Sequence, residues 1–117
     1  MRGVRGAITV KNNSVDDILK ATEKLLKKVI RENNIKRKEI ISINFTATSD
    51  LTAEYPSVAA RKMGYTRVPL LNFQEMNVEG SLARCIRLLI YINRNCSLDE
   101  ISHIYLRQAK KLRPDLA

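Results

Sequence analysis

An arginine in the middle of an apolar stretch is the residue of this chain whose position most strongly suggests chemistry. Residues 83–92 are rich in branched and aromatic side chains, which predicts a strand that carries Arg87 on the same face as Cys85. A guanidinium stays charged at physiological pH, and burying it without a partner is costly. Either a carboxylate of the same fold, such as Glu75 or Asp115, or an anionic ligand must therefore offset the charge of Arg87.

Other side chains able to bind an anion stand at strand positions or near the ends of predicted elements. They are Arg5, Arg61 and Arg113, with Glu75 and Tyr105 as possible companions. Because arginine forks match carboxylates in a bidentate way, this set suits a small ligand with two carboxylates. The sequence has no Walker loop and no nucleophile elbow, and its single histidine, His103, falls in an apolar strand where a structural role is expected. These residues favour the binding of a dianion over proton transfer or covalent catalysis.

The elements that must position these side chains follow from hydrophobic periodicity and turn residues. Strands are predicted at residues 2–10, 39–46, 68–73, 83–92 and 103–111, with helices at 15–32 and 56–63 and a helical turn at 97–100. Ser14 and Asp17 form a variant capping box before the first helix, and Gly64 ends the second. The order β-α-β-α-β-β-β predicts an α+β fold, a mixed β-sheet with helices on one face.

The second face of this sheet would carry Arg5 and Arg87 among apolar residues. A chain of 117 residues is expected to form one domain, residues 1–117, and to bury only about two-thirds of its unfolded surface. Such a face normally needs a cover. In a chain this small, a second copy of the same chain is the expected cover.

Composition limits the remaining possibilities. A net charge of +9 and a pI near 9.9 invite a nucleic-acid interpretation, but much of the excess lies on solvated lysines and only six residues are aromatic. We therefore expect no nucleic-acid partner. No apolar run is long enough to span a membrane and the N-terminal residues lack a signal-peptide core, so we expect a cytoplasmic protein with no membrane partner. Two cysteines and one histidine, without ligand spacing, predict no metal site.

Several short motifs, taken in order, resemble one known family. They are Arg2-Gly3-Val4-Arg5-Gly6-Ala7, Ala47-Thr48-Ser49-Asp50-Leu51, Gln74-Glu75-Met76, Cys85-Ile86-Arg87, His103-Ile104-Tyr105-Leu106 and Leu112-Arg113-Pro114-Asp115-Leu116. Each motif alone is weak, but their order and spacing together resemble the monofunctional, trimeric chorismate mutases of the α/β class. The resemblance covers nearly the whole chain.

This resemblance implies an enzyme that rearranges chorismate to prephenate by a pericyclic Claisen step, on the route to phenylalanine and tyrosine. No cofactor is implied. The dianionic substrate would use the arginine set, and the positive charge of the chain would steer it. The resemblance also implies a homotrimer that packs its sheets into a pseudo α/β barrel, with active sites between subunits.

The roles of individual residues are likewise carried by the resemblance. Arg87 matches the arginine that hydrogen-bonds the ether oxygen, Arg5 the residue that grips a carboxylate, and Glu75 the carboxylate that binds the substrate hydroxyl. These three are the predicted catalytic residues. The predicted binding set adds Tyr105, the segment Leu71, Asn72, Phe73 and Gln74, and the rim residues Tyr55, Arg61 and Arg113.

Two departures from the family pattern and two rival functions stay open at this level. Val58 replaces a lysine found in some relatives, and Asn72 replaces a cysteine. The chain also ends soon after Arg113, where relatives often carry a longer tail. One rival is a trimeric protein of similar fold that deaminates enamines or imines. The other is a basic nucleic-acid module, which predicts binding that weakens steeply with salt.

Overall fold

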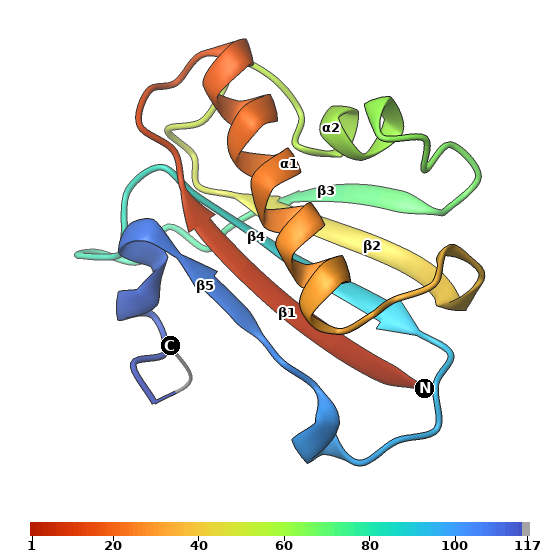
Figure 1. Ribbon diagram of the computed structural model, residues 1–117. Helices are drawn as coiled ribbons and strands as arrows, with labels where there is room; N and C mark the ends of the chain where they lie inside the picture. The colour runs from red at the N-terminus through yellow and green to blue at the C-terminus, as the bar shows by residue number, and fades with distance from the viewer. Residues whose placement is uncertain (116–117) are drawn as a thin grey trace.

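The computed structural model describes residues 1–115 and contains one five-stranded sheet (Figure 1). Leu116, the last residue of the C-terminal motif, lies outside the described residues. The strands are β1 (Arg2–Thr9), β2 (Ile40–Ala47), β3 (Leu70–Gln74), β4 (Cys85–Ile92) and β5 (Ile104–Leu106). Their order across the sheet is β3-β2-β4-β1-β5, so the strand that carries Arg87 lies at the centre.

The sheet is mixed, as the element order predicted. β4 pairs antiparallel with both of its neighbours, β1 and β2, whereas β3 and β5 pair parallel with the strands that they flank. The parallel pair β2–β3 is joined by a connection that leaves the sheet through α2 and returns, whereas β1 and β5 come from opposite ends of the chain. The predicted α+β class and the β-α-β-α-β-β-β order are confirmed.

Both helices lie on one face of the sheet (Figure 1). α1 (Val15–Glu32) packs its apolar stripe, including Ile18, Leu25 and Val29, onto β1, and α2 (Ser57–Lys62) lies beside α1. The backbone N–H of Asp17 donates to Ser14 Oγ, so the predicted serine cap of α1 is confirmed. The reciprocal half of the box was wrong, because the Asp17 carboxylate accepts from Asn12 instead.

The alternation of side chains along β4 separates the core from a second sheet face. Ile86, Leu88, Ile90 and Ile92 are buried in the core under the helices. The intervening residues point the other way, and they belong to what we call the open face. It comprises Arg5 and Ala7 of β1, Asn44 and Thr46 of β2, Leu71 and Phe73 of β3, Arg87 and Leu89 of β4 and Tyr105 of β5.

The prediction for the last strand was wrong beyond residue 106. β5 has only three residues, and the chain then turns into a 3₁₀ helix, η3 (Arg107–Lys111). Arg107 has a φ of 56°, a left-handed conformation that no strand can continue through. Arg84 has a φ of 45°, so β4 begins after it, at Cys85, rather than at residue 83 as predicted.

The other boundaries are close to those predicted. β3 begins two residues later than expected, and α2 is flanked by Pro56 and Met63, with Gly64 at a φ of 96° just beyond. Short 3₁₀ helices precede β2 (η1, Arg37–Glu39) and β5 (η2, Leu98–Glu100). The second confirms the helical turn predicted at 97–100 and has a capping box between Ser97 and Glu100. Among residues 1–115, no helix is long and apolar enough to cross a membrane.

Candidate active site

Arg87 and Glu75 form the centre of the candidate site. The Arg87 guanidinium donates from Nε and Nη2 to the two carboxylate oxygens of Glu75, and the Nη2–Oε1 distance is 2.6 Å. The Arg87 side chain is 50% exposed and that of Glu75 only 15%. The fork uses two of the five N–H donors of a guanidinium and leaves three for a ligand.

Thr46 also holds the carboxylate of Glu75. Its hydroxyl donates to Glu75 Oε2, and Thr46 lies directly across from Arg87 in the β2–β4 register. The Arg87 hydrogen bonds lower the pKa of Glu75, since they favour its charged form. The same fork raises the pKa of Arg87. The pair therefore stays ionised and held in one orientation across the neutral pH range.

Arg5 and Tyr105 meet Arg87 around one cavity on the open face. The cavity has a volume of about 270 Å³ and is also lined by Asn44, Thr46 and Leu89. Tyr105 is buried against Ala7, Cys85 and Ala109, whereas Arg5 is exposed. Cys85 belongs to this small cluster, and burial raises the pKa of its thiol to about 11, so the thiol stays protonated.

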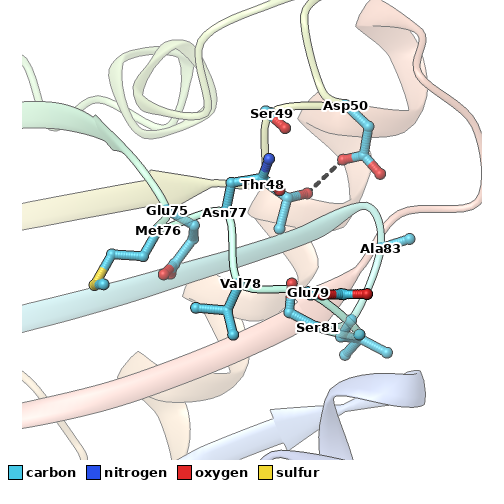
Figure 2. A pocket seen from close by; sticks show the side chains of 12 residues that line it. Thr48, Ser49, Asp50, Glu75, Met76, Asn77, Val78, Glu79, Ser81 and Ala83 are labelled. Atoms are coloured by element: carbon cyan, nitrogen blue, oxygen red, sulfur yellow. Dashed lines mark hydrogen bonds between the residues drawn. The ribbon is translucent and has the colours of Figure 1, made fainter.

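A second hollow lies on the other side of Glu75, at the carboxyl end of β2. Figure 2 shows it between the turn at residues 48–50 and the segment 76–83, with Glu75 and Met76 at one end and Ala83 at the other. Asp50 accepts from Thr48 Oγ1 and from the backbone N–H of Arg84, which ties the turn to the start of β4. A neighbouring cavity of about 270 Å³, which shares Glu75 and Val78 with this hollow, is also lined by Arg87 and Leu112.

The predicted rim residues Tyr55 and Arg61 lie away from Arg87 within one chain. Arg61 is on α2, on the helix-covered side of the sheet, and its Nη1 donates to Ser57 Oγ at 3.3 Å. Tyr55 lines a separate hollow along β3, together with Phe73 and Gln74. A single chain therefore does not bring these two residues to the cavity of Arg5 and Arg87.

The β3 segment divides between the two faces. Leu71 and Phe73 are exposed on the open face, in register with Asn44 and Thr46. The side chain of Asn72 turns toward α2 instead, where it accepts from the backbone N–H of Ser57 at 3.1 Å and donates to Ser57 Oγ at 2.9 Å. Asn72 thus fastens β3 to the start of α2.

Arg113 lies in the last described turn, where its guanidinium forks onto Asp115 at 2.9 and 3.1 Å. This settles one alternative left open by the sequence, because Glu75 rather than Asp115 pairs with Arg87. Burial lowers the pKa of the His103 imidazole, and the charges of Arg5 and Arg113 lower it further.

The arrangement favours binding and charge stabilisation. Fixed cationic donors aimed at one cavity can stabilise negative charge that develops on a bound anion. Within residues 1–115, no group of three His, Cys, Asp or Glu side chains is placed to hold a metal ion. The carboxylate at the centre, Glu75, accepts hydrogen bonds from Arg87 and Thr46.

Sequence reasoning missed Thr46, Asn44, Ser57 and Leu112 as parts of the site. The sequence could have indicated Thr46 and Asn44, because polar residues alternate with apolar ones through β2, which is typical of a strand with one face outside the core. No such pattern marks Ser57 and Leu112. Their roles depend on contacts with residues distant in sequence.

Fold and site together define a small α+β protein whose open sheet face presents two arginines, Arg5 and Arg87, around one cavity. Comparison with known proteins agrees with this class. The family model for chorismate mutase type I matches residues 1–116, and the chain belongs to that family.

Two relatives are each named chorismate mutase AroH. The one from Thermus thermophilus is 46% identical over 99% of this chain and 96% of its own length. The one from Bacillus subtilis (strain 168) is 40% identical over 100% of this chain and 93% of its own length. A solved chorismate mutase from Clostridium thermocellum superposes with a TM-score of 0.92 at 42% identity, covering 95% of this chain and 99% of that chain.

Proposed function

We propose that residues 1–117 form a single chorismate mutase domain and that the open face is the site at which chorismate rearranges to prephenate. In this intramolecular step the ether C–O bond breaks while a C–C bond forms, and no atom or electron enters or leaves. Arg87 donates to the ether oxygen, Arg5 and Tyr105 hold a substrate carboxylate, and Glu75 orients Arg87 and accepts from the substrate hydroxyl. The observation that carries this proposal is the Arg87–Glu75 fork, which presents unused guanidinium donors beside Arg5.

Charge stabilisation explains why these residue types suffice. Negative charge builds on the ether oxygen only as its bond breaks, so a fixed guanidinium stabilises the transition state more than the substrate. A cavity that holds the flexible arm of the substrate close to its ring lowers the entropic part of the barrier. We further propose that the enzyme acts in phenylalanine and tyrosine biosynthesis in the cytoplasm.

The activity is tested by adding purified protein to chorismate and following the loss of its ultraviolet absorbance. We expect acceleration well above the spontaneous reaction, without added metal or cofactor. A rate equal to the spontaneous one, from protein whose circular dichroism shows it folded, would refute the proposed reaction.

We also propose that the active protein is a homotrimer with each site between two subunits. Leu71 and Phe73 are 58% and 49% exposed on the open face, and such apolar side chains are better placed in an interface. Arg61 and Tyr55 lie away from Arg87 in one chain, so a neighbouring subunit could supply them. Light scattering on the purified protein gives the subunit number directly.

A subunit-mixing experiment tests whether the site is shared. Arg87→Ala and Arg61→Ala chains are each expected to be nearly inactive alone. In a random 1:1 mixture, about a quarter of the interfaces would join an intact Arg87 to an intact Arg61 of the neighbour. We therefore expect mixing, followed by dissociation and reassociation, to restore about a quarter of wild-type activity. If both arginines served the same site from one chain, mixing would restore nothing.

A further inference from the structure

The imidazole of His103 holds the backbone of Arg5. The N–H of Arg5 donates to His103 Nδ1 at 2.9 Å. Arg5 stands one residue before the parallel β1–β5 ladder, whose first pair is Gly6 with Ile104. The side chain of His103 therefore adds one hydrogen bond to the shortest strand pairing of the sheet, at the end where Arg5 projects onto the open face.

This bond matters because β5 pairs with β1 over only three residues. β5 has three residues, and it carries Tyr105, which lines the same cavity as Arg5. The residue before His103 is fixed separately, since Ser102 exchanges two hydrogen bonds with the side chain of Asn33 at 2.8 Å each. The side chain of His103 thus helps to hold the backbone of Arg5 in place next to the strand that carries Tyr105.

We propose that His103 is a positioning residue of the dianion site: its neutral imidazole sets the place of Arg5, and its protonation in acid releases that bond and weakens substrate binding. The proposal rests on the proposed role of Arg5 in holding a substrate carboxylate. It assigns His103 no contact with the substrate.

The chemistry of the imidazole dictates the direction of the effect. An imidazole that accepts at Nδ1 is neutral and carries its proton on Nε2. A second proton must go to Nδ1, which then faces the N–H of Arg5 and can no longer accept from it. Among residues 1–115, the charged groups that act on the ring are Arg5 on β1 and Arg113 in the C-terminal turn, the latter paired with Asp115. Burial and these two cations lower the pKa of His103 below its usual value of 6.5.

The first test is an NMR titration of the whole protein labelled with ¹⁵N. The chain has a single histidine, so its imidazole signals need no assignment by mutation. At pH 7.5 we expect the Nε2–H tautomer, and on acidification the backbone amide of Arg5 should shift together with the imidazole. An Nδ1–H tautomer at neutral pH, or an Arg5 amide that does not follow the imidazole, would overturn the proposal without any measurement of activity.

The second test compares two isosteric variants by steady-state kinetics from pH 5 to pH 8. The Oδ1 of asparagine can accept where Nδ1 did but does not titrate, whereas glutamine places its amide nearer the position of Nε2. For wild-type protein we expect KM to rise about fivefold in acid, the size of one lost hydrogen bond, with kcat little changed. His103→Asn should keep the neutral KM throughout, and His103→Gln should have the raised KM at every pH.

Asn33→Ala supplies the structural control. It removes the anchor of Ser102 and should lower the melting temperature, yet it should keep the acid-dependent rise of KM because His103 is intact. The proposal would be overturned if the KM of His103→Asn rose in acid as it does in wild type, or if His103→Gln had the wild-type KM at neutral pH. If wild-type protein did not accelerate chorismate loss at all, the proposed function would fail, while the NMR titration would still decide whether His103 holds Arg5.

Discussion

Replacement of Arg87 by alanine tests the chemistry of the open face most directly. The substitution removes a cation and the three guanidinium donors that Glu75 does not use. Loss of one preorganised donor to developing charge costs about 10²–10³ in rate. Since a full charge is lost with the donors, we expect kcat to fall by at least about 10³, or about 4 kcal/mol of transition-state stabilisation. KM should change far less, because the lost interaction is strongest in the transition state.

A second consequence of Arg87→Ala must be separated from the first. Glu75 would keep its bond from Thr46 but lose the partner that holds its pKa down, and its carboxylate would face an incoming dianion. The double variant Arg87→Ala/Glu75→Gln removes that repulsion. We expect the double variant to have a KM near that of wild type, while its kcat stays as low as that of Arg87→Ala.

The assay is the initial rate of chorismate loss at saturating substrate, with circular dichroism and light scattering on each variant. Arg31→Ala is a matched control, because Arg31 is exposed in the last turn of α1, in the helix layer on the opposite side of the sheet, and its loss changes the net charge equally. We expect Arg31→Ala to keep wild-type kcat. A kcat for Arg87→Ala within tenfold of wild type, or its recovery in the double variant, would refute the proposed role of Arg87.

The remaining predictions concern stability. Glu39 accepts a fork from Arg94, which lowers the pKa of Glu39 from 4.5 to about 2, so this carboxylate stabilises the fold above pH 4.5 and loses that effect as pH falls toward 2. Glu39→Gln should lower the free energy of unfolding by about 1–2 kcal/mol at pH 7, which is a fall in melting temperature of about 4–8 °C. The difference in melting temperature from wild type should become smaller below pH 4.5. A difference that does not depend on pH would contradict this prediction. Asn72→Ala removes two hydrogen bonds of the buried Ser57, whose Oγ then keeps only the bond from Arg61, and should cost about 1–3 kcal/mol, measured by urea unfolding. Asn77→Ala, at an exposed position of the loop after Glu75, should leave stability unchanged.

Much of the fold could be predicted from local pattern. The spacing of apolar residues in α1 and in β4 identifies each element and the face that it buries, and Ser14 marks the start of α1. Alternation along β4 alone placed Arg87 on the side opposite Ile86 and Leu88, which are both core residues. Where a single residue overrides the pattern, as the left-handed Arg107 does at the end of β5, local reasoning overran the strand.

The sequence by itself determined that a charged side chain would stand on a sheet face that also carries apolar residues. It left open whether Glu75 or Asp115 would pair with that charge. Only the tertiary structure decided for Glu75, because strand order sets which distant residues meet. β2 lies between β3 and β4, and at its carboxyl end Glu75, just after β3, meets Thr46 and Arg87. The link from His103 to Arg5 arose in the same way, since it joins residues at opposite ends of the chain through a parallel pairing that no local pattern encodes.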